Sequence, residues 1–146
     1  MYDQAREAIL NSSEASSVYI GADSIRYKNK KGEWFAKYSV VIILHMDSKH
    51  GAKIFHKNFV DRDFGNMRQR LITEAGYAID AATNILDVLG ERKLEIHLDL
   101  NPNPKYKSSV AVKEALGYVK GSLGIDAKIK PESFAATHAA DHIVRG

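Results

Sequence analysis

The fold class is first indicated by VYIGADS, residues 18–24. This run of β-branched, aromatic and small residues has the length of a strand and carries a carboxylate, Asp23, near its end. Two more runs of this kind come next, WFAKYSVVIILHM at Trp34–Met46 and GAKIFHKNFV at Gly51–Val60. Short polar turns at 28–32 and 47–51 separate the three runs. Strands joined in this way predict an antiparallel meander.

Beyond residue 60 the hydrophobic period changes from that of a strand to that of a helix. Apolar residues recur at three- and four-residue steps from Met67 to Leu89, which predicts a long amphipathic helix over 66–89 that ends at Gly90. The remaining pattern predicts a strand at Leu94–Leu100, a helix from Ser108 or Ser109 to about Lys120, a short strand at Ile125–Lys130 and a final helix at Phe134–Val144.

This order of elements predicts an α/β fold with helices on both faces of a five-stranded mixed sheet. Strands that follow helical crossovers run parallel, so the expected strand order is 3-2-1-4-5, with strand 2 antiparallel. With 146 residues, the chain suits one domain over 1–146, in which 1–17 form a short peripheral helix and a connection. Ligands of open α/β sheets bind beyond the carboxyl ends of the strands, here between strands 1 and 4.

The composition excludes several classes of site. The chain has no cysteine, so disulfides, thiolate zinc sites and cysteine nucleophiles are ruled out. A polar N-terminus and the absence of long apolar runs predict a cytoplasmic protein with no membrane partner. The net charge of +3 is compatible with a nucleic-acid partner. Basic residues cluster at Lys28, Lys30 and Lys31, at Arg68 and Arg70, at Lys105 and Lys107, and at Lys128 and Lys130.

Two carboxylates, Asp23 and Asp99, fall at the ends of the first and fourth predicted strands. Each alone is compatible with an ordinary strand end facing water. If strands 1 and 4 are neighbours, however, the two acids lie at the same edge and repel each other unless a cation intervenes. The pair therefore predicts a metal site.

Glu74 lies on the apolar stripe of the long predicted helix, one residue before Ala75 and four before Ala78. A charge on that stripe needs a metal or another partner, and the alternative partner is Arg70, four residues earlier.

On the final predicted helix, Asp141 precedes Arg145 by four residues. The spacing fits a surface ion pair between them as well as it fits a metal ligand. His138 and His142 are also four apart, a spacing that is more often incidental than metal-binding.

Three motifs resemble the ribonuclease H superfamily, and more specifically the YkuK-type family of bacterial and phage ribonuclease-H-like proteins. They are IGADS at Ile20–Ser24, HLDLNPNPKYKSS at His97–Ser109 and KIKPESFAATHAAD at Lys128–Asp141. The resemblance implies that Asp23, Glu74, Asp99 and Asp141 are metal-binding, catalytic residues. Two Mg²⁺ or Mn²⁺ ions would share Asp23 and Asp99, with Glu74 and Asp141 completing one site each, and His138 is a possible proton shuttle.

The loop that follows Asp99 carries the expected contacts to nucleic acid. Phosphate contacts are predicted for Asn101, Lys105, Lys107 and Lys130, and base stacking for Tyr106. A rigid turn stiffened by proline and capped by Ser108 is a compatible alternative.

The superfamily's proofreading exonucleases carry Glu two positions after the first Asp. This chain has Ile25 there, which argues against that branch.

Other superfamily branches also fit incompletely. The segment after Gly121 is too short for the basic protrusion of many hybrid-cleaving enzymes, and nothing marks the dimer face of a junction resolvase. The expected function is therefore a hydrolase, a metal-dependent nuclease acting on RNA, RNA/DNA hybrid or DNA. The alternative is a non-catalytic protein that keeps the fold and binds nucleic acid or a protein partner. The sequence leaves the oligomeric state open.

Overall fold

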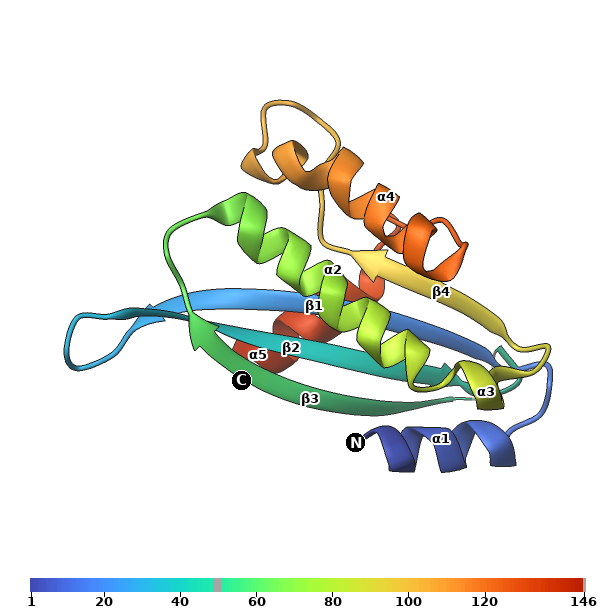
Figure 1. The fold of residues 1–146 in the computed structure, drawn as a ribbon. Coiled ribbons are helices and arrows are strands. Elements are labelled where there is room, and N and C mark those ends of the chain that lie inside the picture. Colours follow the sequence, from blue (N-terminus) through green and yellow to red (C-terminus); the bar gives the residue numbers. More distant parts are fainter. Residues whose placement is uncertain (49–50, 146) are drawn as a thin grey trace.

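The computed structural model describes residues 1–48 and 51–145 and shows a mixed sheet with helices on both faces (Figure 1). The strands are β1 (Ser17–Lys28), β2 (Trp34–His45), β3 (Ala52–Arg62) and β4 (Lys93–Leu98). The α-helices are α1 (Tyr2–Asn11), α2 (Met67–Thr83), α3 (Leu86–Leu89), α4 (Val112–Leu123) and α5 (Asp141–Arg145). A π-helical segment, η3 (Ala135–Ala140), leads into α5, and 3₁₀ turns occupy Met46–Ser48 and Lys107–Ala111.

The sheet has the order β3-β2-β1-β4, which confirms the predicted order of the first four strands. β1 runs antiparallel to β2 and parallel to β4. The last register pair between β1 and β4 is Ala22 with Leu98, so Asp23 and Asp99 are the next residues on each strand. β1 continues to Lys28, whereas the sequence predicted its end at Ser24.

The predicted fifth strand at Ile125–Lys130 is wrong, because the described residues form a sheet of four strands. One parallel bridge remains, in which Lys128 pairs with His97. Lys128 N donates to Ile96 O at 2.7 Å, and Leu98 N donates to Lys128 O at 2.9 Å. Lys130 N also donates to Leu100 O at 3.0 Å, and Pro131, which has no N–H to donate, follows directly.

The long predicted helix is divided into α2 and α3. Asp80 O accepts from the Asn84 side chain at 2.8 Å as well as from Asn84 N at 3.1 Å, and Ile85 N then bonds to Ala82 O at 3.0 Å, three residues back, where the helix breaks. Gly90 follows α3 with a φ of 57°, as predicted for the helix end. The next helix, α4, begins after a 3₁₀ turn and ends at Gly124, not at Gly121, because Gly124 supplies the left-handed conformation.

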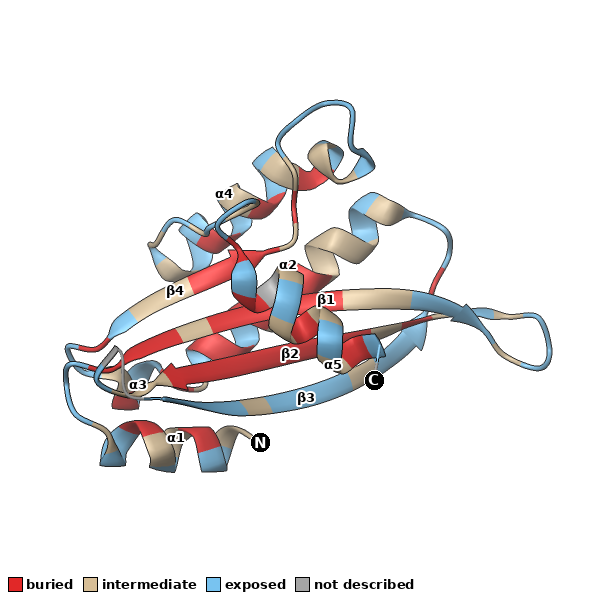
Figure 2. Ribbon diagram, turned by 180° about the vertical axis from the view of Figure 1, so that it is seen from behind, coloured by how far each residue is buried: buried red, intermediate tan, exposed pale blue. Residues whose placement is uncertain are grey.

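The core lies mainly between α2 and the sheet (Figure 2). Alternate residues of β1 and β2 face α2, whose alanines allow the helix to approach the sheet closely. Ala5 and Ile9 of α1 are fully buried in this core, so the expectation of a peripheral first helix was wrong. On the opposite face, η3 and α5 pack against β1 and β2. β3 is largely exposed (Figure 2).

None of the helices in the described ranges is long and apolar enough to cross a lipid bilayer.

Candidate functional site

The structure brings the four predicted acids, Asp23, Glu74, Asp99 and Asp141, to one cavity of about 220 Å³. β1 extends further than β4. Beyond Ala22, no strand of the described residues pairs with the edge of β1 that faces β4. Carboxylates from both layers of helices can therefore meet there. The cavity is also lined by Ser24, Met67, Arg70, Leu71, Ser108, Lys130 and Arg145.

Consecutive residues of β1 serve the two layers of the site. Ser24 Oγ donates to Glu74 Oε2 on α2 at 2.9 Å. Asp23 instead forms a hydrogen bond with Asp141, at the start of α5 on the opposite face of the sheet. The alternation of side chains along a strand explains this division. The site therefore depends on the packing of both helical layers against the same strand.

The pKa values of Asp23 and Asp141 are shifted in opposite directions. Burial, the hydrogen bond with Asp141 and the charge of Asp99 raise the pKa of Asp23 to about 8. Partial burial of Asp141 favours its neutral form, but the hydrogen bond from Asp23 and the Arg145 guanidinium outweigh burial, so the pKa of Asp141 is lowered. At neutral pH, protonated Asp23 is thus the donor and ionised Asp141 the acceptor.

Glu74 is a buried acid, with 4% of its surface exposed, as its place on the apolar stripe predicted. Burial and the nearby charge of Asp23 raise the pKa of Glu74 well above its usual value, although the bond from Ser24 opposes this shift. The alternative partner, Arg70, forms its ion pair with Asp63 at 3.9 Å. Glu74 is therefore held in the cavity at an energetic cost that a cation would relieve.

Basic side chains contact the other two acids. Lys130 Nζ lies 2.9 Å from Asp99 Oδ1, and Arg145 Nε lies 2.7 Å from Asp141 Oδ1. The ion pair that the sequence offered as an alternative for Asp141 is thus present beside the contact with Asp23. Thr137 Oγ1 also donates to Asp99 Oδ1, at 3.3 Å.

The donor set fits a hard divalent cation in its chemistry, since carboxylate oxygens are the ligands that Mg²⁺ and Mn²⁺ prefer. Burial and the neighbouring carboxylates raise the pKa values of Asp23 and Glu74, and a bound cation would favour the ionised form of both. In the described ranges, however, no three His, Asp or Glu side chains already surround one point as ligands. Binding would require these side chains to turn toward each other and Lys130 to release Asp99.

Only some of the residues predicted to contact nucleic acid lie at the carboxylate cavity or next to it. Lys130 lines the carboxylate cavity and, with Asn101 and His138, an adjoining cavity of about 530 Å³. Ser108 Oγ accepts from Asn101 N at 3.0 Å, which agrees with the capped-turn reading of the loop. The other predicted contacts lie on this loop or just after it, outside the lining of both cavities: Lys105, Tyr106 and Lys107.

His97 takes a positioning role that sequence reasoning missed. It is fully buried, and its Nδ1 accepts from Ala135 N at 3.1 Å. This bond attaches the start of η3 to β4 and so helps place Thr137 and Asp141. Arg70 was also missed as a lining residue, although its position four before Glu74 on the same helical face was a usable signal.

Comparisons with known proteins agree with this architecture. The chain matches the ribonuclease H-like family over residues 1–145. It is 28% identical over 141 residues to the uncharacterized protein YkuK of Bacillus subtilis (strain 168), a match that covers 86% of this chain and 77% of that protein. No solved structure matches the chain significantly. Because the family match spans almost the entire sequence, the chain belongs to the ribonuclease H-like family.

Proposed function

We propose that this protein is a metal-dependent nuclease that hydrolyses phosphodiester bonds of RNA, RNA/DNA hybrid or DNA. The observation that carries the proposal is the meeting of Asp23, Glu74, Asp99 and Asp141 in one cavity of a ribonuclease H-like chain. The acids come from β1, from α2, from the residue after β4 and from α5. A surface cluster would not explain why two of them are buried.

In this proposal the four carboxylates hold two Mg²⁺ or Mn²⁺ ions. Bound ions would activate a water molecule and stabilise the leaving oxygen of an in-line displacement. The chain's own basic groups then acquire a second role. When Asp99 and Asp141 turn toward the ions, Lys130 and Arg145 become available for phosphate oxygens at the cavity rim.

A non-catalytic nucleic-acid-binding protein is the second candidate. The contacts of Lys130 with Asp99 and of Arg145 with Asp141 favour it, because internal cations already offset part of the charge. In that case phosphate would bind to these basic groups, and the acids would serve to hold Lys130 and Arg145 in place.

A cleavage panel distinguishes the two candidates. The purified protein is incubated with Mg²⁺ or Mn²⁺ and end-labelled RNA/DNA hybrid, single-stranded RNA, single-stranded DNA, duplex DNA and a four-way junction. Asp99→Asn removes a proposed ligand with little change of shape, and Asp126→Asn is the matched control, since the Asp126 side chain is 88% exposed. We expect cleavage by the wild type and by Asp126→Asn, and a loss of at least about 100-fold in Asp99→Asn.

Two results would count against a nuclease. Equal cleavage by Asp99→Asn would assign the activity to a contaminant or to another site. Absence of cleavage across the panel, with tight nucleic-acid binding retained, would favour the non-catalytic candidate. Titration with Mn²⁺ alone, followed by calorimetry, tests the metal site independently, and Asp99→Asn should lower that affinity.

A further inference from the structure

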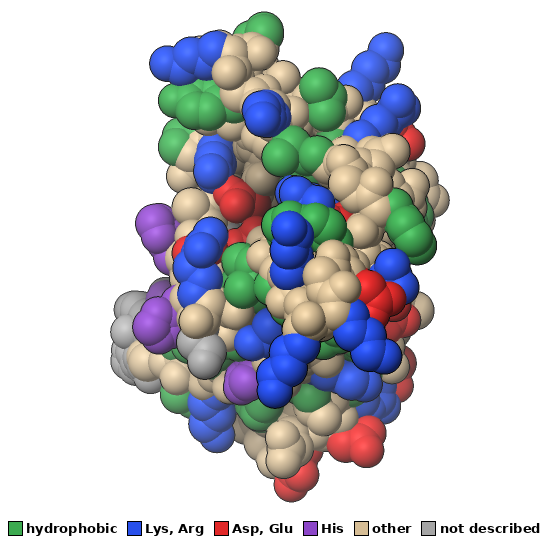
Figure 3. All heavy atoms as spheres, turned by 90° about the vertical axis from the view of Figure 1, so that its left-hand side faces the viewer, with side chains coloured by type: hydrophobic (Ala, Val, Ile, Leu, Met, Phe, Trp, Pro, Cys, Tyr) green, Lys and Arg blue, Asp and Glu red, His purple; other side chains and the backbone are tan. Residues whose placement is uncertain are grey.

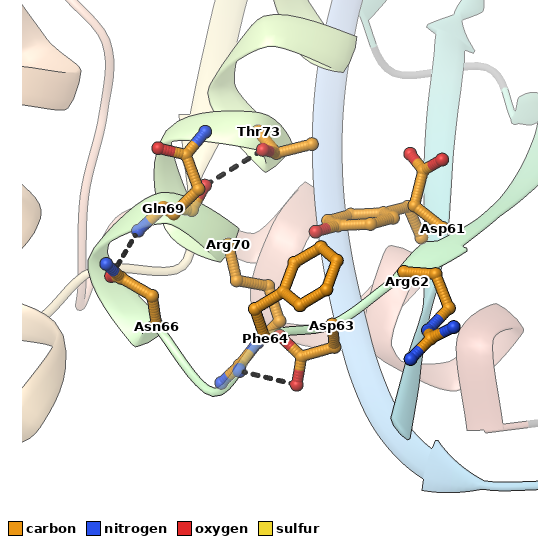
Figure 4. A pocket seen from close by; sticks show the side chains of 9 residues that line it. Asp61, Arg62, Asp63, Phe64, Asn66, Gln69, Arg70 and Thr73 are labelled. Carbon is orange, nitrogen blue, oxygen red and sulfur yellow. Dashed lines mark hydrogen bonds and ion pairs between the residues drawn. The ribbon is translucent and has the colours of Figure 1, made fainter. Parts of the chain in front are cut away.

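A third cavity, of about 390 Å³, lies beside the carboxylate cavity, between the end of β3 and the start of α2 (Figure 4). We call it the Phe64 pocket. It is lined by Tyr38, Asp61, Arg62, Asp63, Phe64, Asn66, Gln69, Arg70 and Thr73. Arg70 lines this pocket and the carboxylate cavity alike, so the two adjoin through one side chain. Its volume is in the range of small-ligand sites.

Phe64 is the most unusual residue of the pocket, because 83% of its surface is exposed. The Arg62 guanidinium lies 5.7 Å from the centre of its ring and 5.4 Å from that of Phe35. An exposed ring next to a guanidinium offers one flat apolar surface and one cationic edge. This combination suits the π-face of a nucleobase.

The other side of the pocket is polar and well ordered by hydrogen bonds. Asp63 accepts from Arg26 Nε and lies 3.9 Å from Arg70 Nη1, so its charge is matched within the protein. The side chains of Asn66 and Gln69 are exposed at the start of α2, across Arg70 from Phe64 in Figure 4, and Asn66 Oδ1 accepts from Gln69 N at 2.9 Å. Amide groups there can exchange hydrogen bonds with the edge of a base.

The surroundings of the pocket are basic, as a polyanion requires. The hairpin between β1 and β2 projects past α2 (Figure 1) and carries Lys28, Lys30 and Lys31. At its base, Arg26 and Lys28 lie 4.3 and 5.2 Å from the ring centre of Trp34. Figure 3, which views this end of the molecule, shows blue basic side chains spread over the face, with red acidic side chains among them and along its right-hand and lower edges.

We propose that the Phe64 pocket binds an unpaired nucleobase of a strand whose phosphate lies at the carboxylate cavity. The base stacks on Phe64, and the hairpin lysines hold the neighbouring phosphates. This inference rests on the proposed function and narrows its substrate: the bound strand must have an unpaired nucleotide next to the phosphate at the acids. Single-stranded or splayed nucleic acid meets this condition, and continuous duplex does not.

A fluorescent base tests the proposal without turnover. A single-stranded DNA oligonucleotide of ten residues with 2-aminopurine at one central position is titrated with the protein in EDTA at low salt. Stacking on Phe64 changes the 2-aminopurine emission, and anisotropy of an end label reports the affinity. Phe64→Ala should weaken binding about 10-fold and abolish the emission change, because one stacked base contributes on this scale. Phe64→Trp should preserve both signals.

The controls separate stacking from general damage. Phe64 is exposed, so its replacement should leave the fold intact, and Leu10→Ala is a matched change of an exposed apolar residue on α1, where 60% of Leu10 is exposed. An oligonucleotide with abasic sites in place of the central bases should bind the wild type less tightly and Phe64→Ala no less tightly than the intact strand.

Equal affinity of wild type and Phe64→Ala would overturn the proposal, as would an equal abasic penalty in both proteins. Tighter binding of blunt duplex than of single strand, with no effect of Phe64→Ala, would do the same. These readouts do not depend on cleavage. A failure of the nuclease assay with a positive stacking result would therefore reject the proposed function alone.

Discussion

Removing the buried acid Asp23 by the substitution Asp23→Asn should stabilise the protein at alkaline pH. Asp23 has a pKa of about 8 in the folded chain against 3.8 for the free side chain. Each pKa unit corresponds to about 1.4 kcal/mol, so the free energy of unfolding falls by about 6 kcal/mol as the pH rises across this interval. Motion of the side chain toward water lowers this figure, and we expect an observed gain of about 1–3 kcal/mol at pH 9.

The sign of the effect follows from the protons bound in each state. Between pH 4 and pH 8 the unfolded Asp23 is ionised while the folded Asp23 keeps its proton, so unfolding releases a proton. The contribution of Asp23 to wild-type stability therefore falls from about pH 4 to pH 8 and levels off above it. In Asp23→Asn this contribution is absent, and the difference between the two proteins should grow with pH.

Urea denaturation at pH 5, 7 and 9 in EDTA measures this difference. The chain has one tryptophan, Trp34, whose fluorescence can report unfolding together with circular dichroism. Asp126→Asn serves as the control for removal of an exposed carboxylate. If the stability of Asp23→Asn follows the wild type in parallel across the three pH values, Asp23 is not protonated in the folded chain. The assignment of Asp23 as the hydrogen-bond donor to Asp141 would then be wrong.

Three further predictions concern other parts of the structure. Lys130→Gln should raise the Mn²⁺ affinity about 2- to 5-fold, since it frees an oxygen of Asp99, and calorimetry that shows weaker Mn²⁺ binding would contradict this role. His97→Leu should leave Ala135 N without its acceptor, costing about 1–3 kcal/mol, and should speed amide exchange across 135–141; unchanged exchange there would exclude a positioning role. Ile9→Ala should destabilise the protein by about 2–4 kcal/mol in thermal unfolding, whereas a truly peripheral α1 would give almost no change.

The sequence predicted that Asp23 and Asp99 lie at the ends of neighbouring strands and that Glu74 is buried. The order of the elements placed the two aspartates, and the apolar stripe of the helix placed Glu74. Helical spacing alone did not place Asp141, which rested on the family resemblance. Its local partner, Arg145, and its distant partner, Asp23, are both present, and only the distant one depends on tertiary packing.

Other features lay beyond sequence reasoning for physical reasons. The apolar pattern of 125–130 suits a strand, but the pattern does not reveal that its neighbour β4 ends at Leu98. A helical period predicted α1 without showing which of its faces docks on the core. Phe64 lies in a polar stretch without hydrophobic periodicity. The sequence therefore does not show that its ring is exposed, which only the folded chain reveals.

Because the site lies where β1 extends past β4, it depends more on the number of residues in β1 than on their type. Asp23 and Ser24 serve opposite helical layers because strand residues alternate between faces. Insertion or deletion of one residue between 17 and 22 would exchange their directions, placing a carboxylate against Glu74 and a hydroxyl against Asp141. An odd-numbered change in the length of this strand would therefore turn Asp23 away from Asp141 and dismantle one half of the site.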